Sequence, residues 1–224
     1  LVAFADVKLD SRYDHMFDNS GFSADMTQNT LKTQWGDISH IYYDANDNGR
    51  MYSYNQANIT TSWVGRNWSV VAGPGIIASS RGQFNPAYSF IGDYQPTNDT
   101  NIELTADRAP IMAGGARDGS PVTKIADYVS DNITLSAEYQ ATKELNVSGG
   151  VLTQQISDGN QKRGVFAKIH YQLDDNWGIQ YRNKIIFSDY TSPEYFSPSE
   201  FHRNWLLLTY TRPMFDDRVV LKLA

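Results

Sequence analysis

Four consecutive segments decide the fold: NITLSAEYQA (132–141), LNVSGGVLTQQI (145–156), RGVFAKIHYQL (163–173) and WGIQYRNKIIFS (177–188). Apolar and polar residues alternate along them, most strictly in the first, third and fourth. This period of two is that of β-strands with one apolar and one polar face. The apolar positions of these three segments are Ile133, Leu135, Ala137 and Tyr139, then Val165, Ala167, Ile169 and Tyr171, and then Ile179, Tyr181 and Ile185.

Short polar connections separate the four segments, at 142–144, 157–162 and 174–176. Connections this short make neighbouring strands antiparallel. Strands of soluble proteins are usually about 5–6 residues long, whereas a tilted strand that crosses a bilayer needs roughly 9–11. Each segment is close to the longer value. The sequence therefore predicts an all-β, antiparallel up-and-down transmembrane β-barrel, with the apolar face toward lipid and the polar face toward water.

The overall composition is compatible with one domain of this kind. The chain has 224 residues, of which 41% are hydrophobic, with a net charge of −6 and no cysteine. No run of about 18 apolar residues is present, which excludes a transmembrane helix. The lack of cysteine excludes disulfides, a thiolate nucleophile and a Cys-ligated metal. The acidic balance argues against nucleic acid as a partner. We expect residues 1–224 to form a single β-barrel domain.

Less regular patterns predict the other strands, and polar stretches predict loops. Residues 11–21, 107–127 and 189–201 are expected loops, and the last two are long enough to plug or gate a barrel. About a dozen strands, and an end inside a strand pattern, favour part of a larger barrel or chain. The remaining expected strands are 1–9, 23–35, 38–43, 51–64, 68–78, 86–94, 102–106, 205–212 and 218–223.

Two motifs that contain glycine carry structural information. Asp44, Asn46, Asn48 and Gly49 match the first half of a calcium loop, yet the twelfth position is Asn55 where such loops need Glu. The hairpin tip signal of Asn-Gly is the better interpretation. Within strand 68–78, Gly73-Pro74-Gly75 predicts a bulge or a sharp bend.

Catalytic and metal-binding signals are weak. Glu138, Glu103 and Asp107 are the best candidates for glycoside hydrolysis, which needs two carboxyl groups roughly 5–10 Å apart. A polar lumen explains these acids more simply. His170 alternates with Lys168 and Gln172, and no two histidines have metal-site spacing. No nucleophile-elbow, P-loop or dinucleotide motif is present. We expect no enzyme activity, no metal and no cofactor.

Large aromatic residues lie at or near the predicted strand ends. Aromatic girdles at the two membrane interfaces would place them there, whereas a soluble sandwich would place them mid-strand in its core. Aromatic rings on the inner face could also stack on sugars. The residues concerned are Trp35, Tyr42, Tyr43, Tyr52, Tyr54, Trp63, Trp68, Trp177 and Trp205.

Several short motifs, mainly within residues 65–224, carry a resemblance to one family. They are Ser157-Asp158-Gly159-Asn160 followed by Arg163, Tyr195-Phe196-Ser197-Pro198, Gly73-Pro74-Gly75, and an interrupted match over Arg108-Ala109-Pro110 and Pro121-Val122-Thr123. Together they resemble the C-terminal outer-membrane barrels of bacterial exopolysaccharide exporters of the cellulose and poly-N-acetylglucosamine type, and related stand-alone barrels. Such barrels have roughly 16 strands, more than are predicted here.

The resemblance implies a function and a cellular location. It implies a pore in the outer membrane of a Gram-negative bacterium that exports an exopolysaccharide, as in biofilm formation. The implied partners are the polysaccharide, the lipid bilayer, a periplasmic tetratricopeptide-repeat region and an inner-membrane synthase complex. On the polar faces of the predicted strands, the candidate lumen residues are Gln56, Asn58, Thr60, Glu138, Gln140, Lys168, His170, Gln172, Gln180, Arg182 and Lys184.

Two alternatives remain open at this stage. A soluble carbohydrate-binding or carbohydrate-cleaving β-protein would turn the sheet inside out and bury Ile133, Leu135, Ala137, Val165 and Ile169 in a protein core. A non-specific porin would keep the barrel but lack a polysaccharide preference. The direction of the apolar side chains distinguishes the first alternative from a membrane barrel.

Overall fold

The described part of the chain folds into one antiparallel sheet of thirteen strands. The structure is a computed structural model that describes residues 7–17, 22–33, 35–47, 49–111, 128–191, 200–214 and 217–223. No helix in these ranges is long and apolar enough to cross a membrane. The strands are β1 (Lys8–Phe17), β2 (Phe22–Thr33), β3 (Gly36–Asp47), β4 (Arg50–Val64), β5 (Trp68–Ser79), β6 (Phe84–Thr97), β7 (Thr100–Pro110), β8 (Val129–Gln140), β9 (Leu145–Ile156), β10 (Gln161–Gln172), β11 (Trp177–Ser188), β12 (Glu200–Met214) and β13 (Asp217–Leu223).

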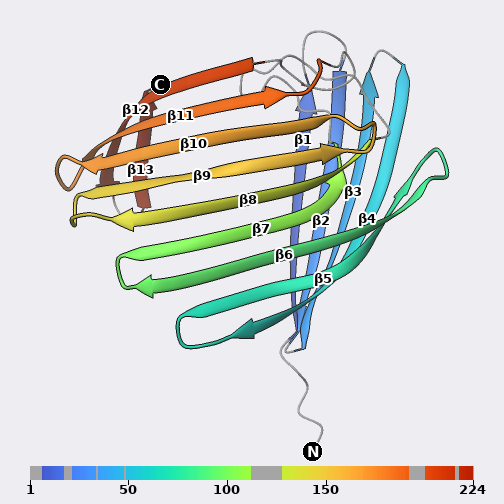
Figure 1. The fold of residues 1–224 in the computed structure, drawn as a ribbon, viewed down its shortest axis with the longest axis horizontal. Helices are drawn as coiled ribbons and strands as arrows, with labels where there is room; N and C mark the ends of the chain where they lie inside the picture. The colour runs from blue at the N-terminus through green and yellow to red at the C-terminus, as the bar shows by residue number, and fades with distance from the viewer. Residues whose placement is uncertain are drawn as a thin grey trace, which may run out of the picture.

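Each strand pairs with its neighbours in the sequence, so the topology is the predicted up-and-down meander. Figure 1 shows the sheet curving strongly, with β1–β4 running steeply across the direction of β8–β11. Within the described residues, β1 and β13 pair on one side only, and the ring is not closed. The predicted all-β barrel class is therefore confirmed, in an open form.

The connections differ between the two rims of the sheet. At one rim, which we call the short-turn rim, connections of two to four residues join β2 to β3, β4 to β5, β6 to β7, β8 to β9, β10 to β11 and β12 to β13. At the opposite rim, the long-loop rim, connections of up to 18 residues join β1 to β2, β3 to β4, β5 to β6, β7 to β8, β9 to β10 and β11 to β12. Because β1 starts beside the turn between β2 and β3, where Lys8 pairs with Lys32, the first strand enters the sheet at the short-turn rim.

The two faces of the sheet differ in burial because the sheet is curved. On β4, Tyr54 is 1% exposed, whereas Met51 on the opposite face is 68% exposed. Tyr43 and Tyr54 are paired across β3 and β4, and their rings stack at 5.2 Å. We call the face of Tyr43 and Tyr54 the inner face and the opposite one the outer face. Paired residues of neighbouring strands lie on the same face, and the two faces alternate along a strand. The register therefore assigns each residue of the remaining strands to the inner or the outer face.

A small packed layer occupies part of the inner face. Ala24, Tyr43, Tyr54, Ile77 and Ala87 belong to one buried hydrophobic cluster on β2–β6. The inner face of β8–β11 instead carries mostly polar side chains. The polar face predicted from the sequence thus forms one part of the inner face, beside an apolar and aromatic part that was not predicted.

Several predicted boundaries were wrong. The segment 11–21, expected as a loop, is largely strand β1, and residues 1–6 of the expected first strand lie outside the described residues. Strands β6 and β7 are longer than 86–94 and 102–106, so the expected loop 107–127 begins four residues later. Most of that loop and of 189–201 lies outside the described residues. Within β12, strand structure already begins at Glu200.

The predicted turns are confirmed, whereas the predicted bulge is not. Gly49 and Gly159 adopt positive φ values of 85° and 94°, which glycine allows at no steric cost. Gly73-Pro74-Gly75 does not shift the register, since Asn58 pairs with Gly75 and Thr61 with Ala72 on either side of it. Because Pro74 has no N–H, the pairing of β4 with β5 is interrupted at Gly73 and Pro74, but no residue is inserted. The register shifts instead between Tyr94 and Thr97.

Candidate functional site

The register places all the predicted lumen residues on the inner face. On β8, β10 and β11 they form two rows across the strands. One row runs Glu138, Ser148, Lys168 and Arg182, and the other Gln140, Asn146, His170 and Gln180. Gln172 lies two residues beyond His170, and Lys184 two beyond Arg182. The strands of the meander thus bring these residues together as one polar surface.

The residues predicted on β4 form a separate group. Gln56 and Asn58 are 7% and 6% exposed, and they lie beside the buried Tyr54. Asn58 donates to the Ser39 hydroxyl at 3.5 Å and accepts from Gln56 at the same distance. Thr60 lies further along the same face. These side chains share the inner face with the rows on β8–β11 but are packed into the buried layer.

Hydrogen bonds hold the polar rows in place at the short-turn rim. Asn146 donates to Glu138 at 2.7 Å and to Gln140 at 3.1 Å. Gln140 in turn donates to the Thr142 carbonyl at 2.6 Å. Arg182 donates to Gln180 at 3.1 Å. The amides are therefore tied to the strand ends, and their orientation is fixed.

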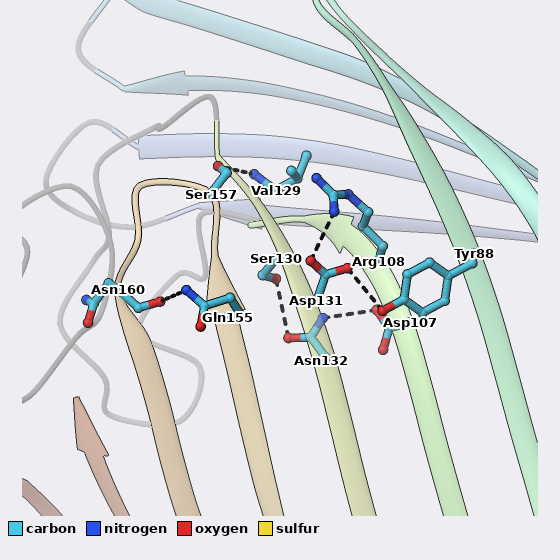
Figure 2. Close-up of polar contacts among 10 residues, drawn as sticks. All are labelled: Tyr88, Asp107, Arg108, Val129, Ser130, Asp131, Asn132, Gln155, Ser157 and Asn160. Atoms are coloured by element: carbon cyan, nitrogen blue, oxygen red, sulfur yellow. Dashed lines mark hydrogen bonds and ion pairs between the residues drawn. The ribbon is translucent and has the colours of Figure 1, made fainter. Parts of the chain in front are cut away.

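A second network lies on the inner face near the long-loop rim (Figure 2). Asn132 donates to Asp107 across β7 and β8 at 3.0 Å. Gln154, on β9, donates to Asn132 at 2.8 Å and to Ser130 at 3.0 Å. The sequence assigned Asn132 to the polar face but gave no sign of this network, because it depends on the register between three strands.

One residue away, the outer face carries a network of its own. In Figure 2, Asp131 accepts from Tyr88 and from Arg108, each at 3.0 Å. The adjacent outer-face position toward the centre of β8 is Ile133, which is exposed. This ion pair therefore lies at the edge of the apolar band, where a strand leaves the hydrocarbon and polar side chains are tolerated.

The apolar side chains of the meander point outward. Ile133 and Leu135 are 44% and 46% exposed, and Val165 and Ile169 are exposed to a similar extent. The soluble alternative, which buried these residues in a protein core, was therefore wrong. An exposed apolar band of this size on a curved β-sheet is what a lipid-facing surface requires.

The aromatic prediction was right in part. Tyr43, Tyr52 and Tyr54 are buried on the inner face, and Trp205 is also on the inner face because it pairs with Arg182. Pairing across strands, which the sequence does not reveal, decides these positions. Outer-face aromatics do gather at the short-turn rim, as a girdle would. They are Trp63, Trp68, Tyr94, Tyr139, Tyr171 and Trp177.

The structure offers no clear catalytic or metal centre in the part that it describes. No group of three His, Asp or Glu side chains there could hold a metal ion. His170 pairs with Asn146 and Gln180. Glu138 and Asp107, proposed above for a hydrolytic pair, each accept a hydrogen bond from an amide. Both lie on the inner face, as the polar-lumen interpretation predicts.

Comparison with known proteins supports the fold. No protein-family model and no curated protein matches the chain. Among solved structures, a bacterial polysaccharide outer membrane secretin aligns with a TM-score of 0.65 and 11% identity, over 97% of this chain and 74% of that one.

Two porin structures align less well. The KdgM porin in complex with disordered oligogalacturonate has a TM-score of 0.41 and 11% identity, over 83% of this chain and 92% of the porin. The NanC porin has a TM-score of 0.40 and 11% identity, over 90% of this chain and 97% of the porin. The fold, with its apolar outer band and aromatic rim, is that of an outer-membrane β-barrel and supports the predicted outer-membrane location.

Proposed function

We propose that this chain forms an outer-membrane pore that exports a polysaccharide without enzymatic activity. The observation that carries the proposal is the pair of polar rows on the inner face of β8–β11, behind an outer face of apolar side chains. Amides, a histidine and charged groups on one surface can replace the water around sugar hydroxyls along a moving chain. Export of a polysaccharide is also what the sequence motifs imply.

The lengths of the connections give the pore an orientation. Outer-membrane barrels have short periplasmic turns and longer extracellular loops. We therefore place the short-turn rim at the periplasm, where β1 begins. A periplasmic tetratricopeptide-repeat region and an inner-membrane synthase complex, the partners that the resemblance implies, would meet this rim. The connections between β7 and β8 and between β11 and β12, in which the predicted loops 107–127 and 189–201 largely lie, would gate the opposite mouth.

The open edges bear on the size of the barrel. A transmembrane sheet cannot expose unpaired backbone N–H and C=O groups to lipid, so both β1 and β13 need a partner strand. We propose that residues 1–224 are one domain within a larger barrel, in which further strands connect these two edges.

Single-channel recording in planar bilayers tests the proposed function. The full-length protein should give discrete conductance steps, and added oligosaccharides should interrupt them reversibly because the sugar occupies the lumen. A non-specific porin would conduct with no interruption by any oligosaccharide at the same concentrations. Conductance without saccharide block would therefore contradict the export proposal and favour a general porin.

A further inference from the structure

Between β6 and β12, charge is separated by sign along the inner face. Within the described residues, the charged side chains on the inner face of β10–β12 are all basic, and those of β6–β8 are all acidic. Strand β9 lies between them and has no charged residue. The basic set is Lys162, Lys168, Arg182, Lys184 and Arg203, and the acidic set is Asp93, Glu103, Asp107 and Glu138.

Three of the four acidic side chains have a hydrogen-bond donor, whereas two lysines of the basic set have no polar partner among the described residues. Asp107 and Glu138 accept hydrogen bonds from amides, and Asp93 accepts one from Ser69 at 3.3 Å. Lys168 and Lys184, in contrast, make no ion pair or hydrogen bond with any described residue. Like charges on neighbouring strands repel each other, and an anion placed among them removes that cost. The ammonium groups of Lys168 and Lys184 are therefore available to bind an anion.

A hollow brings these cations together with aromatic rings. It measures about 480 Å³, and its lining includes Lys168, Arg182, Lys184, Phe166 and Trp205. Phe166 pairs with Lys184, and Trp205 pairs with Arg182, so rings and cations alternate on adjacent strands. The Arg203 guanidinium lies 4.4 Å from the centre of the Trp205 ring, which adds a further cation beside the hollow.

We propose that the inner face of β10–β12 binds the carboxylate groups of an acidic polysaccharide, with Phe166 and Trp205 packing against its sugar rings. This inference rests on the proposed function and specifies its substrate class. Lysine ammonium groups bind carboxylates as mobile point charges, which suits a chain that must slide, and aromatic rings pack against the apolar faces of pyranoses. The neutral strand β9 keeps the acidic wall away from the polyanion.

Blocking experiments in planar bilayers with the full-length protein test this assignment. The probes are oligogalacturonate, neutral cello-oligosaccharide and cationic glucosamine oligosaccharide of equal length. Oligogalacturonate should block at the lowest concentration. The variant Lys168→Gln/Lys184→Gln should raise its half-blocking concentration roughly tenfold, because two charge-assisted contacts are lost in a solvated site. Block by the neutral probe should change little.

A matched variant and a salt series control for folding and net charge. Lys143→Gln/Arg163→Gln also removes two positive charges, but from the turn after β8 and from the outer face of β10, and should leave the block within about twofold. Folding of both variants is checked by their shifted mobility on unheated gels. In the unmodified protein, raising the salt concentration should weaken block by oligogalacturonate and not by the neutral probe.

The outcomes separate the two proposals. Stronger block by the neutral or cationic probe, an unchanged block in Lys168→Gln/Lys184→Gln, or a salt-independent block by oligogalacturonate overturns the acidic substrate class and leaves polysaccharide export standing. Ion conductance without block by any saccharide overturns the proposed function, and the substrate class with it.

Discussion

The outer faces of β8–β11 and β1–β4 belong to one sheet but differ in chemistry. On β8–β10, the outer face presents Leu135, Val151, Val165 and Ile169, all exposed. On β1 and β2, the same face presents polar groups that bond to one another. Ser11 donates to Asn29 at 2.8 Å, and Asp25 accepts from the Tyr13 hydroxyl and is 2.8 Å from the His15 ring nitrogen Nδ1.

The polar character extends to β3 and β4. His40 lies 3.1 Å from the Asn55 side chain across the two strands, again on the outer face. Hydrocarbon offers no hydrogen bonds, so polar side chains are tolerated there only where they satisfy one another. The difference teaches that the outer face of β8–β11 is built for lipid along most of its length, whereas that of β1–β4 is not. We expect the two arcs to respond differently to added charge and to lost hydrogen bonds.

The largest effect is expected from a charge placed mid-strand in each arc. Val165→Lys, on the outer face of β10, should lower the free energy of unfolding by roughly 2–4 kcal/mol, the cost of a lysine at the bilayer midplane. Thr27→Lys, at the corresponding depth on the outer face of β2, should cost less than about 1 kcal/mol, because its surroundings are already polar. Denaturant titration in lipid vesicles measures both. Equal losses would contradict the comparison.

An intermediate effect is expected at a polar pair on the outer face between β11 and β12, at the edge of the β8–β11 arc. Asn204 accepts from Asn183 at 2.7 Å and from the Tyr181 hydroxyl at 2.8 Å on the outer face of β11 and β12. Asn204→Leu should cost about 1–2 kcal/mol, because two donors lose their acceptor. In the double variant Asn183→Leu/Asn204→Leu about half of this loss should be recovered, since one of the two donors without an acceptor is removed. A double variant as unstable as the sum of both single variants would contradict this account.

The smallest effect is expected on the outer face of β1 and β2, within the β1–β4 arc. Asp25→Asn should lower the free energy of unfolding by less than about 1 kcal/mol, because contacts between exposed polar groups contribute little and Asn keeps an acceptor oxygen. The same titration measures it. A loss as large as that of Val165→Lys would show that the β1–β2 contacts are buried in an apolar environment.

The same contrast explains which parts of the fold could be predicted from the sequence. Strands β8–β11 were predicted within a few residues, because their two faces meet different media and the period of two is visible. Residues 11–17 of β1 were predicted as a loop because polar side chains are frequent on both faces there. Lys8, Asp10, Arg12 and Asp14 alternate with Ser11, Tyr13 and His15, so little contrast between the faces remains.

The candidate site was predictable only to the level of a face. Alternation placed Lys168, Arg182 and Lys184 on the polar side, which the register agrees with. It could not show that Trp205 joins them, since that depends on the pairing of β11 with β12 across a long connection. Nor could it show that Gln56 and Asn58 are buried, because burial there comes from the curvature of the sheet around Tyr43 and Tyr54.

The most direct test of the central claim compares two adjacent residues of β8. Because the chain has no cysteine, a single spin label can be attached at Ala137→Cys on the outer face or at Ser136→Cys on the inner face. In lipid vesicles, the label at 137 should collide with dissolved oxygen and not with a water-soluble nickel chelate, and the label at 136 should show the reverse. Equal access of the nickel chelate to both labels would contradict a lipid-facing outer surface with a hydrated interior.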